Sequence, residues 1–189
     1  MPRLLVKDVR LSFPNLFTPK AMKAGDKPAC GASFLMPPDH PAVAEITAAM
    51  QAAATEKWAA KAPAMYAALK QTDKICLHDG TLKAAKYDGY EGMLYLSARS
   101  SKAVDVRDRD PNVKLTENDP RPYSGCYVNA LVEIYAQDNA YGQRINATLV
   151  GVQFKRDGEA FAGGAPAADD EFESFDGANA FSNDDGFFG

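Results

Sequence analysis

After Arg156 the sequence contains no lysine or arginine, although 21 such residues precede that point. Residues 157–189 carry nine aspartates and glutamates, and residues 1–156 carry the other 16. The body of the chain therefore has a net charge of +5, and the C-terminal segment one of −9. Such asymmetry is typical of proteins that work on nucleic acids, although a solvated segment that only aids solubility explains it equally well.

The sequence also lacks a long apolar run and is poor in cysteine. No stretch approaches the ~18 apolar residues that a membrane span needs, and MPRLLVKDVR lacks the apolar core of a signal peptide. We therefore expect no membrane partner and a cytoplasmic protein. The cysteines, Cys30, Cys76 and Cys126, are odd in number and far apart, which argues against a disulfide framework and favours buried free thiols. Even with His78 they lack the spacing of a zinc site, so we expect no metal and no other cofactor.

Motifs of enzymes are missing as well. The sequence has no glycine-rich phosphate loop and no serine-centred elbow. The two histidines, His40 and His78, stand beside a predicted helix start and in a predicted turn, where cap and turn roles are expected. These absences predict a protein that is not an enzyme.

One acidic stretch keeps an enzymatic alternative open. Asp105, Asp108 and Asp110 could hold Mg²⁺ for phosphodiester cleavage, as in a metal-dependent nuclease or resolvase. Arg107 and Arg109 are interleaved with these carboxylates and would offset the charge that a metal needs. The binding interpretation given below is therefore preferred.

Alternating apolar residues predict several strands. In residues 4–13, Val9, Leu11 and Phe13 share one face, with Asp8, Arg10 and Ser12 on the other, and Pro14-Asn15 is expected to end this strand. Further strands are expected over residues 29–36, 92–99, 126–135 and 144–154. The last two should form a hairpin with a medium-length loop around residues 138–142. In the strand 126–135, the side chains expected to face the core are Val128, Ala130, Val132 and Ile134.

A helical segment interrupts the strands at about residues 40–70. Asp39 or His40 can cap it, and Pro41 fits the first helical position. A single apolar stripe of core residues follows at steps of three and four: Val43, Ile46, Met50, Ala54 and Trp58. A shorter helix should follow Pro63. Because five or six strands are expected with one helical excursion among the early ones, we predict a mainly β fold with a helical insertion. The expected architecture is an OB-like closed or partly open antiparallel barrel over residues 1–162 and a disordered acidic tail over residues 163–189.

The middle of the chain combines cations with aromatic rings. Proteins that bind single strands need a cationic groove for phosphates and aromatic faces for bases. The candidate nucleic-acid-binding residues are Arg10, Lys83, Lys86, Tyr87, Tyr90, Arg99, Lys102, Arg107, Arg109, Tyr123 and Tyr127. Tyrosine is also common on strand surfaces in any β protein, so no single ring decides the matter.

The acidic tail offers two further functions. Its charges can compete with DNA phosphates for the basic body, and its rings can anchor a partner protein. The candidate tail residues are Asp169, Asp170, Glu171, Phe172, Phe175, Asp184, Asp185, Phe187 and Phe188. A remaining alternative is an interaction protein whose acidic tail mimics DNA and titrates a host factor.

Four stretches resemble a family of bacteriophage-encoded single-stranded DNA-binding proteins, long catalogued as a domain of unknown function. They are residues 9–17, the Tyr87-Asp88-Gly89-Tyr90 stretch, the block running from residues 122–129 to 150–154, and residues 157–161. The resemblance implies an OB-like fold with a disordered acidic C-terminus. It also implies a role in phage DNA replication and recombination inside the bacterial host, with replication or recombination proteins as partners of the tail. Because one small barrel offers a short track for DNA, a homodimer is also considered.

Overall fold

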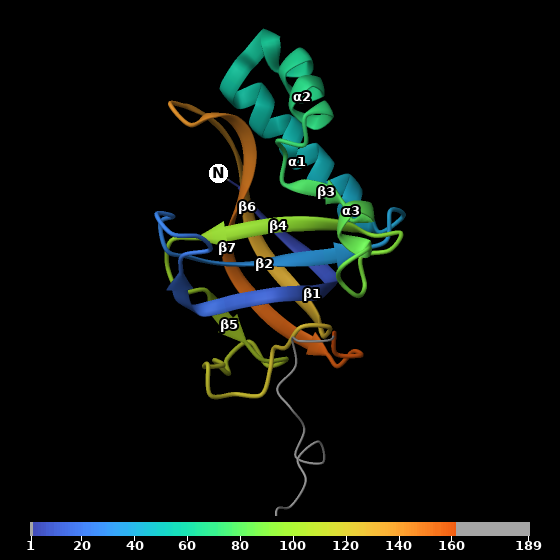
Figure 1. Ribbon diagram of the computed structural model, residues 1–189, viewed down its shortest axis with the longest axis vertical. Coiled ribbons are helices and arrows are strands. Elements are labelled where there is room, and N and C mark those ends of the chain that lie inside the picture. The colour runs from blue at the N-terminus through green and yellow to red at the C-terminus, as the bar shows by residue number, and fades with distance from the viewer. Residues whose placement is uncertain (1, 162–189) are drawn as a thin grey trace, which may run out of the picture.

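Alternating apolar side chains in the strands build one sheet that closes on itself in the computed structural model, which describes residues 2–161. Within these residues the strands follow the order β3-β4-β2-β1-β6-β7-β5, and β4 also pairs with β7. The closed barrel therefore consists of β4, β2, β1, β6 and β7 (Figure 1). The strand bounds are β1 Arg3–Lys20, β2 Ala29–Met36, β3 Leu77–Asp79, β4 Leu94–Ser100, β5 Asp105–Arg107, β6 Tyr127–Asn139 and β7 Gly142–Arg156. The predicted mainly β barrel is confirmed, and closing the sheet removes its free edges.

The barrel is antiparallel except at its closure. The neighbours β1–β2, β1–β6, β2–β4 and β6–β7 are antiparallel. By contrast, β4 meets β7 in parallel through the single residue pair Arg99 and Thr148. The short strand β5 also runs parallel to β7. Arg99 thus stands at the seam where the two ends of the sheet meet.

The first strand is longer than predicted and is bent by bulges. It continues past Pro14-Asn15, because a register shift between Ser12 and Asn15 takes up the irregularity. Phe13 has a φ of 49°, and its ring is 50% exposed, whereas Ser12 is 2% exposed. The prediction that Phe13 faces the core is therefore wrong. A bulge adds a residue on one strand and so interrupts the two-residue alternation of faces.

Strand β6 alternates regularly from Tyr127 to Ile134, although its register with β7 shifts between Leu131 and Val132. The predicted core residues Val128, Ala130, Val132 and Ile134 are all buried. Asn139 pairs with Gly142, so only two residues form the turn, and the predicted medium-length loop is wrong. Gly142 has a φ of 104°, which suits a glycine in a tight turn.

A helical arm lies beside this hairpin (Figure 1). It consists of α1 Pro41–Trp58, the 3₁₀ turn η1 Ala59–Lys61 and α2 Ala62–Gln71, which confirms the predicted insertion; a short helix, α3 Thr81–Ala84, follows β3. The His40 side chain accepts a hydrogen bond from the Ala42 amide at 3.1 Å, as expected of a cap. Ile46 and Met50 are buried in the core. No helix in residues 2–161 is long and apolar enough to span a membrane.

Two hydrogen bonds join the helical arm to the hairpin, and a third, within the hairpin, holds the acceptor of one of them. The indole nitrogen of Trp58 donates to Asp138 Oδ2 at 2.9 Å, and Gln143 Nε2 donates to the same oxygen at 3.2 Å. The Ile145 amide donates to the Lys74 carbonyl just beyond α2 at 3.0 Å. Trp58 packs partly buried against the core, as the apolar stripe predicts. The insertion therefore braces the hairpin against the barrel.

The last described residues fold back onto the barrel. Phe161 is 8% exposed, and its amide donates to the Ser124 carbonyl at 3.1 Å. Its ring lies against Gly89, where a side chain would collide with it, and 4.2 Å from the Arg10 guanidinium carbon. The predicted tail, residues 163–189, lies outside the described residues, so its boundary and disorder remain predictions. Phe161 therefore attaches the last described residues to the barrel.

The three cysteines are free and buried, as predicted. Burial raises the pKa of Cys76 to about 12 and that of Cys126 to about 11. These thiols are therefore neutral at physiological pH and act as apolar packing groups.

Candidate nucleic-acid interface

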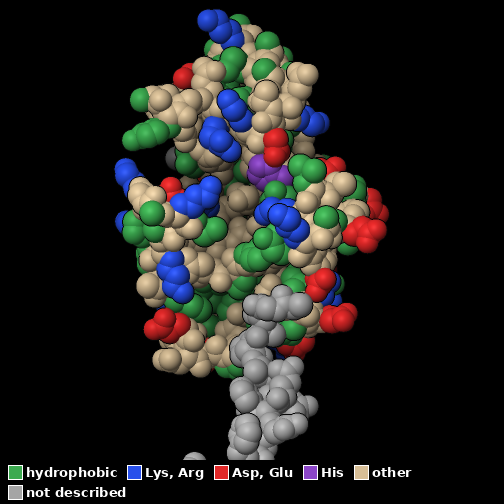
Figure 2. Space-filling model, in the orientation of Figure 1, with side chains coloured by type: hydrophobic (Ala, Val, Ile, Leu, Met, Phe, Trp, Pro, Cys, Tyr) green, Lys and Arg blue, Asp and Glu red, His purple; other side chains and the backbone are tan. Residues whose placement is uncertain are grey.

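The barrel surface is hollowed around Arg99. Three adjoining hollows of about 650, 480 and 480 Å³ share this residue as a lining group. We call these three hollows together the Arg99 groove. It begins at Phe13 and Lys83, passes Lys27 and Lys102, and ends at the hairpin residues Tyr135 and Arg144. Figure 2 shows a hollowed face with Lys and Arg side chains around it, and most acidic side chains of this face stand toward its margins.

The groove is strongly cationic. Six of its lining side chains are basic, and a single one, Asp26, is acidic: the cations are Lys23, Lys27, Lys83, Arg99, Lys102 and Arg144. Within residues 2–161, none of these six makes an ion pair. Their charge is thus available to an external anion, and a chain of phosphates is the polymer that such a row of cations attracts.

Aromatic rings are exposed at one end of the groove. Phe13 and Tyr87 meet edge to face with ring centroids 4.8 Å apart, and they are 50% and 44% exposed. The Lys83 ammonium lies 5.8 Å from the Phe13 ring and 4.4 Å from the Tyr95 ring. Burial against these rings lowers the pKa of Lys83. A base stacked on Phe13 or Tyr87 would bring its phosphate close to this cation.

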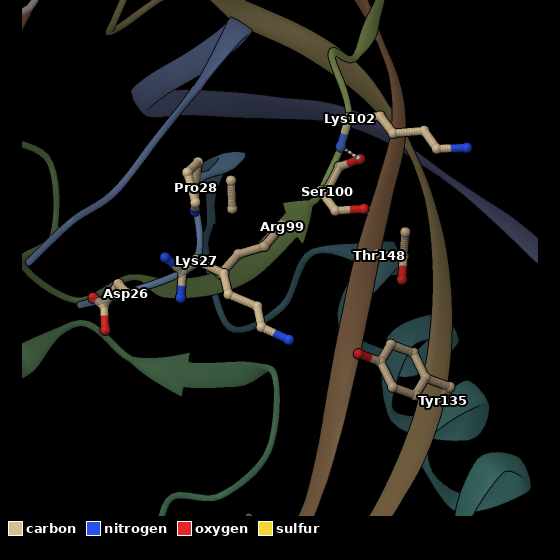
Figure 3. Close-up of a pocket in the computed structure, with 10 residues that line it drawn as sticks. Asp26, Lys27, Pro28, Arg99, Ser100, Lys102, Tyr135 and Thr148 are labelled. Carbon is tan, nitrogen blue, oxygen red and sulfur yellow. Dashed lines mark hydrogen bonds between the residues drawn. The ribbon is translucent and has the colours of Figure 1, made fainter.

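The middle of the groove combines side chains from three parts of the chain (Figure 3). Arg99 comes from β4, Lys27 from the connection between β1 and β2, and Tyr135 from β6. Tyr135 lies across the hollow from Arg99 and Lys27 in this view. The Lys102 amide donates to Ser100 Oγ at 3.1 Å, which orders the turn after β4. A nucleic-acid strand in this hollow would meet the cations Arg99 and Lys27 on one side and the Tyr135 ring on the other.

Gly31 keeps the floor of the groove low. It pairs with Arg99 across β2 and β4, and a Cβ added at this residue would lie 2.8 Å from the Ala98 carbonyl oxygen. Any side chain here would clash with the neighbouring strand. The absence of a side chain also leaves room beside the Arg99 stem.

The predicted residues separate into two groups. Lys83, Arg99 and Lys102 line the groove. Tyr87 contacts Phe13 at the aromatic end, and Lys86 is exposed in the turn just before it. These five residues remain candidates for contacting DNA.

Tyr90 is a correction, because it is fully buried. Its hydroxyl donates to Ser12 Oγ at 3.0 Å, and its ring packs against Tyr95 with centroids 5.4 Å apart. The bulge that turns Ser12 inward supplies the buried partner that the tyrosine hydroxyl needs. Tyr90 therefore supports the floor beneath Phe13 and Tyr87, and no base can reach its face.

The second group of predicted residues does not line the groove, and its side chains are already bonded. Arg10 donates to the carbonyls of Gly125 and Glu159, and Arg109 donates to the Lys155 carbonyl at 2.9 Å. Arg107 pairs with Asp105 at 2.8 Å. These bonds hold the loops and the segment 157–161 in place.

The two tyrosines of this group are also engaged. The Tyr123 hydroxyl donates to Asp157 Oδ1 at 2.8 Å. The Arg156 guanidinium covers the Tyr127 ring at 3.5 Å from its centroid. The candidates therefore do not all lie on one surface. Aromatic and basic residues close in sequence can serve either a groove or the attachment of a terminal segment.

The carboxylates of the metal alternative are occupied. Asp105 pairs with Arg107, and these bonds hold the pKa of Asp105 below its usual value. Asp108 pairs with Arg121 at 2.8 Å, while Asp110 accepts from the Asn112 amide at 2.9 Å. No group of three His, Cys, Asp or Glu side chains within residues 2–161 is placed to hold a metal ion.

Five groove residues were missed by the sequence-based candidate set: Phe13, Lys23, Lys27, Tyr135 and Arg144. The alternation of apolar residues places Phe13 on the same face as Val9 and Leu11, because such a pattern gives no sign of a bulge. Lys23 and Lys27 lie in a Pro- and Gly-containing connection whose position depends on the bent β1. Tyr135 does carry a sequence signal, since it alternates with the buried residues of β6 on the same outer face as Tyr127.

The chain matches known phage proteins over most of its length. A family model described as "Enterobacter phage Enc34, ssDNA-binding protein" matches residues 2–185. A curated relative, "Putative protein p50" of Acyrthosiphon pisum secondary endosymbiont phage 1, is 42% identical over 174 residues, covering 90% of this chain and 92% of the relative.

Solved structures of phage proteins share the fold. A C-terminal truncation of the single-stranded DNA-binding protein from bacteriophage Enc34 has a TM-score of 0.68 and 29% identity, and the match covers 84% of this chain and 88% of that one. The same phage protein in complex with ssDNA has a TM-score of 0.68, 27% identity and the same coverage. The bacteriophage T7 protein gp2.5, a single-stranded DNA-binding protein, is similar in fold alone, with a TM-score of 0.54 and 12% identity over 92% of this chain and 98% of that one.

Proposed function

This chain belongs to the family of the Enterobacter phage Enc34 ssDNA-binding protein, and we propose that it binds single-stranded DNA without sequence preference along the Arg99 groove. A single observation carries the proposal. Six cations that make no ion pair in residues 2–161 line three adjoining hollows that share Arg99, and exposed rings stand at one end of them. A relative with 27% identity has been solved in complex with ssDNA, which supports the same ligand here.

The groove favours single strands over duplexes for a physical reason. Phe13 and Tyr87 offer exposed ring surfaces, and a base can stack on them only when its face is free of neighbouring bases. Stacking is tolerant of sequence because every base has a flat π face. The chemistry of the groove is that of binding, and we propose no catalytic activity for it.

An arginine substitution tests this function. We expect Arg99→Gln to weaken binding of oligo(dT) and to reduce the slope of log affinity against log salt by about 1, because one phosphate contact is lost. Arg109→Gln is the matched control, since Arg109 is an exposed arginine outside the groove. Fluorescence titration of a labelled oligonucleotide at two salt concentrations measures both variants. Equal losses in the two variants, or no binding by the wild-type protein, would refute the assignment.

The tail is proposed to regulate the same groove. The chain leaves the barrel at Phe161, whose ring lies against Gly89, two residues from Tyr87. The last described residue, Phe161, therefore lies near the aromatic end of the Arg99 groove. We propose that the carboxylates of the tail compete with DNA phosphates and that its phenylalanines recruit replication or recombination proteins. Its predicted residues lie outside the described part of the chain.

The wider role proposed is protection of single strands during phage DNA replication and recombination in the cytoplasm of the bacterial host. The homodimer considered on account of the short barrel remains a prediction. Sedimentation of the full chain with and without oligonucleotide tests it, because a dimer that doubles the track would form without DNA.

A further inference from the structure

The hairpin end of the Arg99 groove is a pocket of a different kind. This hollow of about 480 Å³ lies between β4 and the β6–β7 hairpin. Its volume falls in the range of small-ligand sites. Its polar lining side chains are Arg99, Arg144, His78, Ser97, Tyr135, Gln137 and Asn146. It lies away from the Phe13 and Tyr87 rings, which line or adjoin a different hollow.

The walls of this pocket are held in place. Asn146 Nδ2 donates to Gln137 Oε1 at 2.9 Å, and Gln137 Nε2 donates to Asn139 Oδ1 at 3.1 Å. On the opposite wall, His78 Nδ1 lies 2.7 Å from Asp73 Oδ1, and the His78 ring stacks on Tyr95 with centroids 5.0 Å apart. A pocket whose side chains are already ordered loses little freedom when a ligand enters.

The charge of the pocket favours an anion. Arg99 and Arg144 are exposed, and neither makes an ion pair within residues 2–161. No carboxylate lines the hollow, and its one thiol, Cys76, is neutral because burial raises its pKa to about 12. Two guanidinium groups beside a ring and neutral amides match a phosphate joined to a nucleoside.

The helical arm supports the hairpin wall of this pocket. Without support, a two-stranded hairpin extending beyond a barrel is only marginally stable. Here Trp58 bonds to Asp138 of the hairpin. Lys74, three residues after the end of α2, bonds to Ile145 of the hairpin. The arm thereby fixes the strands that carry Tyr135 and Arg144.

From this arrangement we infer that the pocket is a subsite for one nucleotide of the bound strand, with its phosphate between Arg99 and Arg144 and its base or sugar against Tyr135. The inference rests on the proposed function and extends it. The DNA track continues from the barrel onto the braced hairpin, and the helical insertion contributes to binding by positioning that hairpin. Trp58 is accordingly a positioning residue.

Oligonucleotide length is the variable that tests the subsite. Affinity of the full chain is measured for oligo(dT) of about 4 to 16 nucleotides, the range of footprints for one OB fold. We expect Arg144→Gln to leave the shortest strands unaffected and to remove the gain in affinity at the longer lengths, by about tenfold. The salt slope for long strands should fall by about 1. Lys70→Gln, an exposed cation on α2 outside the pocket, should change neither quantity.

Two further variants keep the proposal falsifiable. Arg144→Lys should restore the salt slope and only part of the affinity, because lysine keeps the charge and loses the two-pronged hydrogen bonding. Trp58→Phe should reduce the gain with length while the affinity for short strands stays unchanged. Thermal unfolding of each variant checks that the fold is retained.

Three outcomes would overturn the subsite. The first is that Arg144→Gln weakens all lengths equally, and the second is that it weakens none. The third is that thymidine monophosphate or inorganic phosphate binds in an Arg144-dependent manner, while long and short oligonucleotides bind with equal affinity. In that case the pocket binds a soluble phosphate compound. Failure of the wild-type protein to bind any length would instead contradict the proposed function itself.

Discussion

Arg99 on β4 pairs with Thr148 on β7 at the one parallel contact that closes the barrel. The same residue lines all three parts of the groove. Its backbone is therefore fixed by both sides of the sheet, while its side chain stays exposed. A rigid origin and a solvated guanidinium suit a residue that meets a flexible polyanion at the centre of its track.

Removing the exposed rings should weaken DNA binding without unfolding the protein. For Phe13→Ala or Tyr87→Ala we expect a loss of about 1–3 kcal/mol in binding free energy, the usual value for one stacked base. Because both rings are about half exposed, their removal costs little core packing. Tyr141→Ala is the control, since this ring is 86% exposed in the hairpin turn. Titration with oligo(dT) and thermal unfolding together separate binding from stability.

Tyr90 should behave in the opposite way. Tyr90→Ala removes a fully buried ring, and we expect a stability loss of about 3–5 kcal/mol, as for other large aromatic truncations. Tyr90→Phe removes only the hydrogen bond to Ser12 and should cost about 1 kcal/mol. Urea denaturation measures both. A Tyr90→Ala protein of normal stability and weakened DNA binding would show that the ring is a ligand after all.

Deleting residues 163–189 should tighten DNA binding at low salt. The deletion removes seven carboxylates that are proposed to occupy the groove, so phosphates no longer compete with them. Loss of affinity with added salt should also become steeper, because the wild-type competitor is itself weakened by screening over a Debye length of about 10 Å at 0.1 M. Titrations at two salt concentrations measure this.

Two full-length variants with altered tails separate the effect of the tail charges on DNA binding from the effect of its aromatic rings. Replacing the seven tail carboxylates by their amides should reproduce the effect of the deletion. Replacing Phe172, Phe175, Phe187 and Phe188 by alanine should leave DNA affinity unchanged, since these rings are assigned to partner proteins. If the alanine tail also tightens binding, the phenylalanines rather than the charges occupy the groove.

The brace between Trp58 and Asp138 should weaken in acid. Hydrogen bonds from Trp58 and Gln143 hold the pKa of Asp138 below its usual value. A carboxylate with a lowered folded-state pKa stabilises the fold above its unfolded pKa and loses that contribution as pH falls through the folded value. The stability difference between the wild type and Asp138→Asn should therefore shrink from neutral pH to about pH 3. Urea midpoints across this range measure it, and a constant difference would exclude the ion as the stabilising form.

The sequence allowed the buried face to be predicted for a regularly alternating strand, but not for a strand with bulges. In β6 the pairing with β7 is nearly continuous, so Val128 and Ile134 face the core as predicted. In β1 the register shifts, and Ser12 and Phe13 exchange the faces that alternation assigned to them. A bulge depends on the partner strand as much as on its own residues, so local sequence does not specify it.

The candidate site was predictable where cations lack nearby acids. Lys83, Arg99 and Lys102 have no carboxylate bonded to them in the described residues and line the groove. Arg107 has Asp105 two residues away in sequence and pairs with it. Lys27 and Arg144 reach the groove from distant parts of the chain, which only the closed barrel brings together.

Trp58 is the sole tryptophan of the chain, and its indole joins the helical arm to the hairpin. The protein therefore contains a built-in optical reporter at that junction. Excitation of this one fluorophore follows the hairpin alone, without a dye and without interference from the far end of the barrel. A strand too short to reach Arg144 should leave its emission unaltered, and a longer strand should change it.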